Sequence, residues 1–278
     1  MKTNSNDTGS KPVEGNDHDF PPLLVLVMDG KGGVGKSVIS GTVVFSFESL
    51  GEMIAKFDTD TTNSTLTHMY EKARLIDVSK ADWSSPIIQA IRDIAKDGSP
   101  RMMLIDAGAR DEARIKARLG TIATAMAAMG GRVLVIRPIT LSNYAQTNAV
   151  EFAEVTAGSD IAVVFMRIEA QGRQPEDFDD WNTSEALKKA EASGAVNTFM
   201  SDLGVRHADN AVAYGLSFED VAMGRFDKCG EDEGRARQDF PPETQGWFLD
   251  WLDEHRTRWI PVFLEALAMR SGGGGGSR

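Results

Sequence analysis

Short apolar runs alternate with longer segments in which apolar residues recur at helical spacing, from residue 23 to about residue 200. Strands are predicted at Leu23–Met28, Met53–Phe57, Met102–Ile105, Arg132–Ile136, Ile161–Arg167 and Val196–Met200. Helices are predicted at Lys36–Leu50, Ser85–Lys96, Asp111–Met129, Asn143–Ala157 and Ser184–Glu191. Because strands that alternate with helices build parallel sheets covered on both faces, the pattern predicts an α/β fold: a single doubly wound, mostly parallel sheet flanked by helices.

The two ends of the chain differ from this middle part. Residues 1–21 are rich in Asn, Asp, Gly, Ser and Lys and offer almost nothing to bury, so we expect a disordered N-terminal extension. Residues 271–278, SGGGGGSR, have the composition of a flexible linker and are typical of an artificially added tail. Residues 22–270 are therefore expected to form one folded domain, interrupted by polar loops at Gly172–Asn182 and Glu231–Pro242.

Composition narrows the classes of protein to consider. The 278 residues carry 30 Lys and Arg against 41 Asp and Glu, a formal charge of −11, which excludes a surface built throughout to hold nucleic acid but leaves room for a local basic patch. Cys229 is the single cysteine, so the chain can form neither an internal disulfide nor a site with several thiolates. No apolar run approaches the ~20 residues that span a bilayer. We therefore expect a cytoplasmic protein.

A glycine-rich segment, GKGGVGKS at residues 30–37, directly follows the apolar run LLVLVMD and leads into a helical pattern. It satisfies the phosphate-binding pattern G-x-x-x-x-G-K-[ST] in the strand, loop and helix context that the pattern requires. Backbone N–H groups of such a loop and the N-terminus of the next helix bind phosphate oxygens. We expect Lys36 to contact the β- and γ-phosphates of a nucleotide and the Ser37 hydroxyl to ligate Mg²⁺. The predicted nucleotide-binding residues of this segment are Gly30, Lys31, Gly32, Gly33, Val34, Gly35, Lys36, Ser37 and Val38.

Lys31 makes this loop distinctive. The segment KGGVGK resembles the deviant Walker A motif of the ParA, MinD and nitrogenase iron protein superfamily, in which an extra lysine follows the first residue of the loop. The resemblance implies that the chain hydrolyses ATP, that two copies form a homodimer with ATP between them, and that Lys31 reaches the phosphates bound to the partner subunit. Lys31 and Lys36 are accordingly the catalytic lysines that we expect. The alternative is that Lys31 is only a solvated charge.

An acidic segment follows the second predicted strand. The sequence FDTDTTNST at residues 57–65 resembles the superfamily's D-x-D-P-Q-x-N-x-[ST] stretch, which implies that Asp58 and Asp60 correspond to its two aspartates. Asp60 is the candidate for a catalytic role near the metal and the attacking water, whereas Thr61 and Thr62 replace the family's Pro and Gln. The alternative is that both aspartates are turn residues after a strand.

A second acidic segment, MMLIDAGAR at residues 102–110, resembles the Walker B segment. The resemblance implies that Asp106 holds Mg²⁺ through water and that Gly108 is a hinge which senses the γ-phosphate. Ser37, Asp60 and Asp106 are therefore the predicted metal-site residues, and Gly108 joins the predicted nucleotide-binding residues. Asp106 can equally cap the helix that follows it.

The C-terminal segment, residues 247–270, bears on what the protein binds. Its apolar positions can form one helical face, but its acidic residues offset its basic ones, and membrane-surface helices usually carry a basic excess. We therefore expect this segment to pack against the body of the protein or a partner rather than against a membrane, and Pro261 to divide it into two helices. The chain has no pair of thiolates to hold a bridged iron–sulfur cluster, which excludes the iron-protein branch of the superfamily.

The resemblance implies an ATP-dependent dimerising switch that partitions or positions plasmid, chromosome or other cargo and is reset when an adaptor or activating protein stimulates hydrolysis. Weak, non-specific DNA binding, with nucleoid association, would use exposed basic side chains. Two alternatives remain: a MinD-like ATPase at a membrane surface, and a metabolic P-loop ligase of the dethiobiotin synthetase or cobyrinate amidase type. The candidate basic residues are Arg206, Arg225, Lys228, Arg235 and Arg237.

Overall fold

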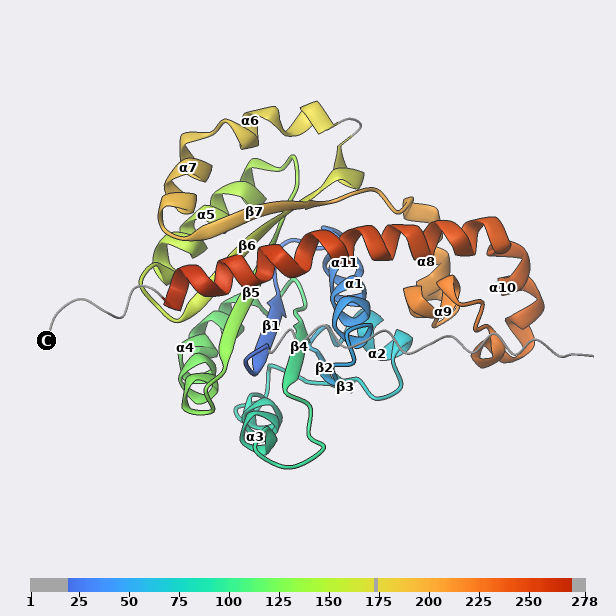
Figure 1. The fold of residues 1–278 in the computed structure, drawn as a ribbon, viewed down its shortest axis with the longest axis horizontal. Coiled ribbons are helices and arrows are strands. Elements are labelled where there is room, and N and C mark those ends of the chain that lie inside the picture. The colour runs from blue at the N-terminus through green and yellow to red at the C-terminus, as the bar shows by residue number, and fades with distance from the viewer. Residues whose placement is uncertain (1–19, 173–174, 272–278) are drawn as a thin grey trace, which may run out of the picture.

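The computed structural model describes residues 20–172 and 175–271 and contains one seven-stranded sheet covered by helices (Figure 1). All neighbouring strands are parallel, in the order β3-β2-β4-β1-β5-β6-β7. The strands are β1 (Leu23–Val27), β2 (Ile54–Asp58), β3 (Arg74–Leu75), β4 (Met102–Asp106), β5 (Arg132–Ile139), β6 (Ile161–Ile168) and β7 (Ala195–Met200). The predicted α/β fold with a doubly wound, parallel sheet is therefore confirmed.

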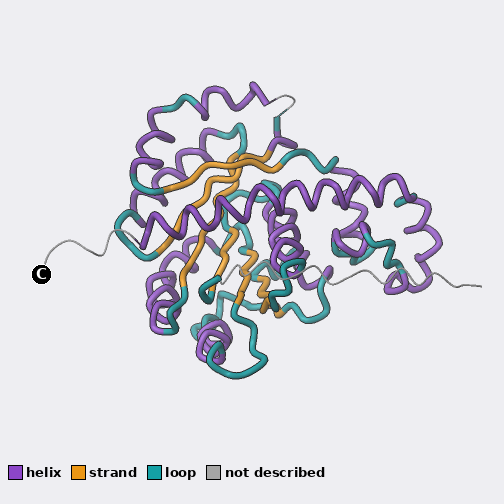
Figure 2. The backbone as a smooth tube through the Cα atoms, in the orientation of Figure 1, coloured by secondary structure: helices purple, strands orange, loops and turns teal. Residues whose placement is uncertain are grey.

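Helices connect successive strands and form a layer on each face of the sheet, as the backbone tube shows (Figure 2). Short 3-10 turns lie at Glu169–Gln171, Pro175–Phe178 and Asp227–Asp232. The helices are α1 (Lys36–Glu48), α2 (Thr65–Met69), α3 (Ser85–Asp93), α4 (Glu112–Ala128), α5 (Asn143–Thr156), α6 (Asp179–Asn182), α7 (Glu185–Ala192), α8 (Val205–Ala213), α9 (Phe218–Ala222), α10 (Glu233–Asp239) and α11 (Pro242–Ser271).

Alternate residues of the strands lie in two separate hydrophobic cores, one on each face of the sheet. Leu23, Val25 and Val27 of β1 face the core that α1, α2, α8, α9 and α11 complete. Leu24 and Leu26 face the core built with α3, α4, α5 and α7. Because a strand buried on both faces is apolar at every position, β1 reads as the continuous run LLVLV rather than as an alternating pattern.

The register of the central strands brings several loops to one edge of the sheet. Val27, the last residue of β1, pairs with Asp106 of β4 and with Ile136 of β5. Asp58, the last residue of β2, also pairs with Asp106. The connections leaving β1 and β4 run to opposite sides of the sheet, and ligands of such folds bind outside the carboxyl ends of the strands at this point. The glycine-rich segment starts here.

Helix α11 lies along the sheet and α1 in a single long rod (Figure 1). Trp259 and Phe263 are fully buried, and the Trp259 indole donates to the carbonyl of Phe199 at 3.0 Å. The prediction that this segment packs against the body is therefore confirmed. The predicted division at Pro261 is wrong, because α11 continues through it. Burial of the neighbouring aromatic residues offsets the cost of about 3 kcal/mol that an internal proline imposes.

Two polar segments were predicted as loops and are partly helical. The segment Glu231–Pro242 contains α10, in which Ala236 is buried and the Arg237 guanidinium packs over the ring of Phe226 at 5.4 Å. The segment Gly172–Asn182 contains a 3-10 turn and α6, with Trp181 2% exposed. One or two buried side chains fix each short helix, and hydrophobic periodicity over so few residues does not reveal them.

The ends of the predicted strands and helices lie within a few residues of the observed ones, but the folded body begins before residue 22. Phe20 is 2% exposed and packs edge-on against Phe47, with ring centroids 5.3 Å apart, although it was assigned to the disordered extension. The rest of that predicted extension, residues 1–19, and the tail from residue 272 lie outside the described residues. Among the helices within residues 20–172 and 175–271, none combines the length and apolarity needed to cross a membrane.

Candidate functional site

The glycine-rich segment forms the loop between β1 and α1. Gly35 precedes the first turn of α1 with φ at 84°, a left-handed conformation that residues with a Cβ rarely adopt. Val34 is buried, whereas Lys31, Gly32 and Gly33 are exposed. The strand, loop and helix therefore have the arrangement in which backbone N–H groups and the helix N-terminus face a phosphate group.

Lys36 lies across this loop at the start of α1. Its ammonium donates to the carbonyl oxygen of Lys31 at 2.8 Å. Burial lowers the pKa of Lys36, and the carboxylates of Asp106, Asp29 and Asp60 oppose that shift. Three carboxylates therefore act electrostatically on Lys36, of which Asp60 and Asp106 were predicted from the sequence as site residues and Asp29 was not.

Asp106, at the end of β4, is the carboxylate best suited to a metal ion. It is 5% exposed, and its Oδ1 atom has no hydrogen-bond donor among the described residues. Burial raises its pKa to about 7, the charge of Asp58 adds to the shift, and Ser37 and Lys36 oppose it. A buried carboxylate oxygen with no partner next to a serine hydroxyl is the kind of oxygen donor set that Mg²⁺ prefers. The residues present thus fit the predicted Mg²⁺, with Ser37 and Asp106 to hold it.

Asp58 differs from Asp106 because both of its oxygens are occupied. Oδ1 accepts from the backbone N–H of Asp60 at 2.9 Å, and Oδ2 accepts from those of Leu66 at 2.9 Å and Thr67 at 3.3 Å. It therefore caps the first turn of α2. Burial raises the pKa of Asp58 to about 6 despite these three donors. Its role in the structure is to hold the loop after β2.

Asp60 lies in the same loop and is half-buried. Its Oδ1 atom accepts from the backbone N–H groups of Thr62 at 3.0 Å and Asn63 at 2.9 Å, which closes a tight turn. The negative charge of Asp60 opposes the lowering of the Lys36 pKa. The predicted catalytic and metal roles of Asp60 stay predictions.

Gly108 joins the loops that follow β2 and β4. Its N–H donates to the hydroxyl of Thr59 at 2.9 Å, and that hydroxyl donates to Asp111 at 2.9 Å. A Cβ at Gly108 would lie 2.5 Å from Oδ2 of Asp111 and 3.1 Å from Cα of Asp60. Only glycine fits this close approach without movement of the backbone. The predicted role of Gly108 as a nucleotide-sensing hinge stays a prediction.

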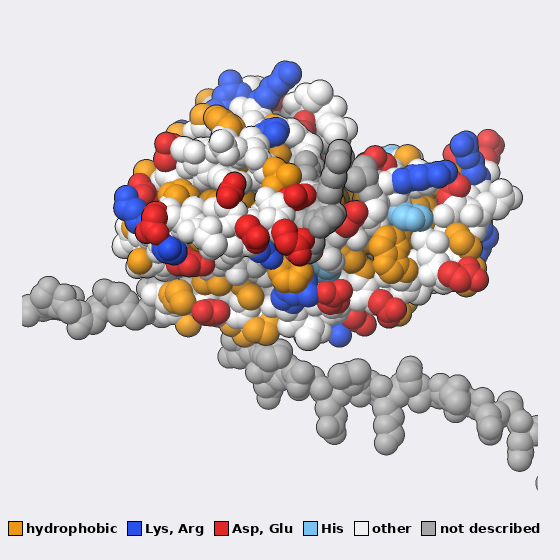
Figure 3. Space-filling model, turned by 90° about the horizontal axis from the view of Figure 1, so that it is seen from above, with side chains coloured by type: hydrophobic (Ala, Val, Ile, Leu, Met, Phe, Trp, Pro, Cys, Tyr) orange, Lys and Arg blue, Asp and Glu red, His pale blue; other side chains and the backbone are white. Residues whose placement is uncertain are grey.

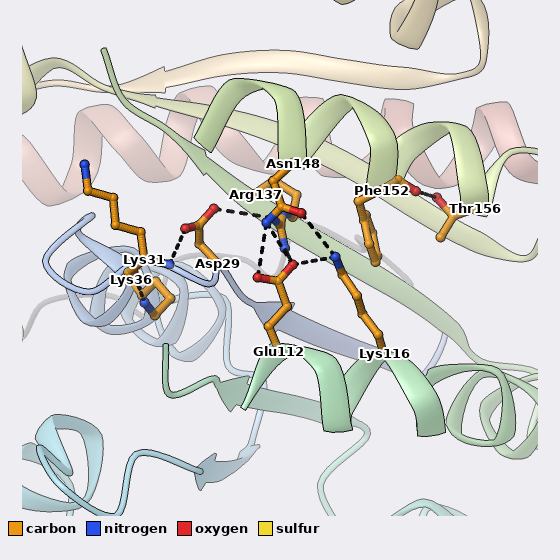
Figure 4. A network of polar contacts seen from close by, with 9 residues as sticks. All are labelled: Asp29, Lys31, Lys36, Glu112, Lys116, Arg137, Asn148, Phe152 and Thr156. Carbon is orange, nitrogen blue, oxygen red and sulfur yellow. Dashed lines mark hydrogen bonds and ion pairs between the residues drawn. The ribbon is translucent and has the colours of Figure 1, made fainter. Parts of the chain in front are cut away.

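On the other side of the loop lies a cluster of charged side chains that the sequence analysis missed (Figure 4). Arg137 on β5 is fully buried, and its guanidinium contacts Asp29 at 3.4 Å and Glu112 at 2.8 Å. Asp29 Oδ1 accepts from the backbone N–H of Lys31 at 2.7 Å. The available signal was an arginine inside the apolar run VLVIRPI and an aspartate directly after LLVLVM. A buried charge needs a partner, so each of these residues should have prompted a search for the other.

The ends of β6 and β7 lie close to the last glycine of the loop. A Cβ at Gly35 would touch the side chains of Ile168 and Met200, at the ends of β6 and β7. Arg167 donates to Asn182 at 2.7 Å and pairs with Glu169 at 3.6 Å, so its guanidinium contacts two side chains of the protein.

The candidate DNA-binding residues are mostly paired with acidic groups. Arg225 contacts Glu219 and Asp220, Lys228 contacts Asp220, and Arg237 contacts Glu233. On the face seen in Figure 3, basic side chains are dispersed among acidic ones. Neither observation supports a continuous basic surface among the described residues.

Comparison with known proteins adds similarity in fold. No family model and no curated protein matches the chain. Among solved structures, it is similar to the MinD cell division protein of Aquifex aeolicus, at 13% identity over 78% of this chain and 96% of that one, with a TM-score of 0.44. It is also similar to a nucleotide-binding protein of Archaeoglobus fulgidus in complex with ADP, at 16% identity over 65% and 82%, with a TM-score of 0.36. A third is the signal recognition particle 54 kDa protein of Aeropyrum pernix in complex with GDP, at 15% identity over 95% and 74%, with a TM-score of 0.43.

Proposed function

We propose that this protein is a Mg²⁺-dependent ATPase of the ParA and MinD type, in which two copies dimerise around ATP and hydrolysis separates them. The observation that carries the proposal is the arrangement of the two lysines of the loop. Lys36 is half-buried among carboxylates, with its ammonium bound back to the loop, whereas Lys31 is exposed on the same loop. This difference supports a role for Lys36 in binding a nucleotide within the subunit and a role for the exposed Lys31 in reaching a second subunit.

The residues of the site have separable roles in this proposal. The N–H groups of residues 30–38 and the Lys36 ammonium bind the phosphates and stabilise the charge that develops on them. The Asp106 carboxylate and the Ser37 hydroxyl would hold Mg²⁺, which would supply Lewis-acid stabilisation of the phosphate oxygens. Asp60 orients the attacking water at the edge where β2 and β4 end. Gly108, between Asp60 and Asp111, transmits the state of the γ-phosphate to α4.

The finer function, positioning of a cargo, rests on the resemblance of the loop and on the absence of competing features. The apolar face of α11 is buried against the sheet, which disfavours a membrane-surface role for that helix. The pairing of Arg225, Lys228 and Arg237 with carboxylates disfavours strong binding to DNA. We therefore expect a protein adaptor to connect the dimer to its cargo and to stimulate hydrolysis in the cytoplasm. ATPase assays with candidate adaptors, with DNA and with small carboxylate substrates distinguish this role from a metabolic ligase, which would release a phosphorylated or ligated product.

Lys31→Ala tests the core of the proposal. We expect the full-length variant to bind ADP as the parent does, because Lys36 and the loop N–H groups remain. We expect it to lose ATP-dependent dimerisation and about 100-fold or more in kcat, the scale seen when one stabilising group of a transition state is removed. Light scattering after size exclusion with ADP or ATP, and steady-state ATPase kinetics, measure the two effects.

The matched control is Lys72→Ala, which removes an exposed lysine in the turn before β3, away from the loop. It should leave both the dimerisation and the hydrolysis unchanged. If Lys31→Ala dimerises with ATP and hydrolyses it at the parent rate, the proposed dimeric mechanism is wrong.

A further inference from the structure

A buried network of charges lies beneath the first residues of the P-loop (Figure 4). It begins with Asp29, at the end of β1, and reaches Arg137 on β5 and Glu112 at the start of α4. Lys116, one turn further along α4, contacts Glu112 at 2.6 Å. Asn148 of α5 donates to both oxygens of Glu112 at 3.2 Å. Four elements of the fold therefore meet at this network.

The network is electrically balanced but costly to bury. Two carboxylates, Asp29 and Glu112, face two cations, Arg137 and Lys116, and the Asp29 and Arg137 side chains are both 0% exposed. Apolar side chains of similar size often stabilise a folded protein as well as a buried ion pair does. The network therefore calls for a role other than stability, and its contact with the loop indicates which one.

Lys31 is the loop residue to which the network connects. Its backbone N–H donates to Asp29 at 2.7 Å, and its carbonyl oxygen accepts from the Lys36 ammonium at 2.8 Å. Both polar groups of its backbone are thus fixed, while its side chain is exposed and points away from the carboxylates (Figure 4). Gly30, just before it, lies so close to Glu112 that an added Cβ would be 2.6 Å from Oε2.

Arg137 fixes Asp29 in turn. The guanidinium is held between Asp29 and Glu112 and packs over the ring of Phe152, with its carbon 5.3 Å from the ring centroid. Because a guanidinium is planar and rigid, contacts on two of its nitrogens and on its face determine its orientation. The Asp29 carboxylate, which the guanidinium contacts at 3.4 Å, is therefore presented to the Lys31 N–H in a defined position.

We infer that Asp29 and Arg137 are positioning residues for Lys31: they fix the peptide of Lys31 so that its ammonium is presented toward a second subunit before that subunit arrives. This inference rests on the proposed function, because it assumes that Lys31 acts across a dimer. It extends that function to residues that touch neither the nucleotide nor the partner. A loop already held in its binding conformation loses less entropy when the dimer forms.

The double variant Asp29→Ala/Arg137→Met tests the inference. It removes both members of the buried pair, which leaves neither charge alone, while Lys116 and Asn148 still hold Glu112. We expect the affinity for ADP, measured by calorimetry with Mg²⁺, to stay within about 3-fold of the parent. We expect ATP-dependent dimerisation and kcat to fall about 10- to 100-fold, the loss that follows removal of one hydrogen bond to a charged group. The KM for ATP should change far less than kcat.

Two further variants separate positioning from general damage to the fold. Asp29→Asn/Arg137→Met also removes the ion pair but keeps an oxygen that can accept from the Lys31 N–H, so it should recover part of the lost dimerisation, and the remaining defect reports the contribution of Arg137. Glu48→Gln removes a carboxylate from the ion pair with Lys56, whose atoms lie 2.6 Å apart, at the far end of α1. It should behave as the parent in both assays.

The double variant in a Lys31→Ala background provides a readout that a purely structural role would not move. If Asp29 acts through Lys31, Asp29→Ala/Arg137→Met should cause no further loss once Lys31 is absent. The same comparison with Asp29→Ala alone, which removes the acceptor for the Lys31 N–H and leaves Arg137 paired with Glu112, decides the matter if the double variant does not fold.

The outcomes distinguish the inference from the function on which it rests. If Lys31→Ala is defective but Asp29→Ala/Arg137→Met dimerises and turns over as the parent does, the positioning inference is wrong and the proposed function stands. Losses that simply add in the Lys31→Ala background also overturn the inference. If Lys31→Ala itself is fully active, the proposed function is wrong instead.

Discussion

The buried carboxylates on the two sides of the P-loop differ in whether their oxygens have hydrogen-bond donors. On the side of β2 and β4, Asp106 is buried with one oxygen that has no hydrogen-bond donor among the described residues. On the side of β5 and α4, Asp29 and Glu112 are saturated by Arg137, Lys116 and backbone or amide donors. A buried carboxylate oxygen without a hydrogen-bond donor destabilises the folded protein unless a ligand binds it, whereas a fully paired carboxylate can serve as part of the scaffold.

This contrast distinguishes residues that are proposed to bind a ligand from residues that hold the loop in position. In the proposed function, the loop rests on the side with the paired carboxylates and would face the nucleotide and Mg²⁺ with the side of Asp106. Asp58 shows that position alone does not decide the role, because it lies beside Asp106 in the sheet yet spends both oxygens on backbone N–H groups. The role of each aspartate is therefore indicated by whether its carboxylate oxygens have hydrogen-bond donors, and not by how close it lies to the loop.

The substitution Asp106→Asn is expected to have the largest effect, and it tests whether the unpaired carboxylate binds a ligand or belongs to the scaffold. Because Asp106 is predicted to hold Mg²⁺ through water, its substitution should lower kcat about 10- to 100-fold, the range typical when an outer-shell partner of a metal is removed. The free energy of unfolding should not fall, because a neutral amide replaces the buried Asp106 carboxyl group, whose pKa burial raises to about 7. ATPase kinetics over a range of Mg²⁺ concentrations and urea unfolding measure the two effects. A variant that loses several kcal/mol of stability, or retains parental kcat, would show that Asp106 is part of the scaffold.

A smaller effect is expected from Gly108→Ala, which probes the junction between the two acidic loops. The new Cβ would lie 3.1 Å from the Cα of Asp60 and 2.5 Å from Asp111 Oδ2, so a loop must shift. Overpacking of this kind costs about 1–3 kcal/mol of stability. We expect kcat to fall about 10-fold, since a displacement of 1 Å at a reacting centre can cost even more. Gly120→Ala, on an exposed position of α4 with open space around it, is the matched control and should cause neither change. Equal effects of the two substitutions would argue against a special role for the junction.

The smallest effect concerns a buried titratable group far from the loop in sequence, His255 on α11. Its Nδ1–H donates to the carbonyl of Trp251 at 2.6 Å, and its Nε2 accepts from the N–H of Ser201 at 3.0 Å, so the neutral ring is fully paired. Burial lowers the pKa of His255 from 6.5 to about 4. Between these values the unfolded chain takes up a proton that the folded protein does not, so this group makes the protein less stable as the pH falls.

Linkage gives the size of this effect as about 1 kcal/mol of lost stability between pH 7 and pH 5.5. His255→Gln removes the titration, so its unfolding free energy should fall less than that of the parent over this interval. Urea unfolding at both pH values measures the difference, which cancels the contributions of other groups such as Asp58. An identical pH dependence in the two proteins would mean that His255 is accessible to protons in the folded state.

Much of the fold and one part of the site follow from the amino-acid sequence. Short continuous apolar runs such as LLVLV, followed by turn residues, indicate strands covered on both faces, and the spacing of glycines and Lys36 after such a run predicts a phosphate-binding loop. The same reasoning located Asp106 at the end of a strand. These features are local, because a few consecutive residues contain the whole physical cause.

Which polar groups have hydrogen-bond or ion-pair partners became clear only from the tertiary structure. Asp29 and Arg137 are 108 positions apart in the sequence, and no local pattern reveals that they form a pair beneath Lys31. Helix α11 continues through Pro261 because its neighbours Trp259 and Phe263 are buried, Phe263 against the distant Phe47, and Phe20 belongs to the core because it packs against the same Phe47. Burial and pairing of charges depend on partners that the fold brings together, so the scaffold of the loop could be recognised only in three dimensions.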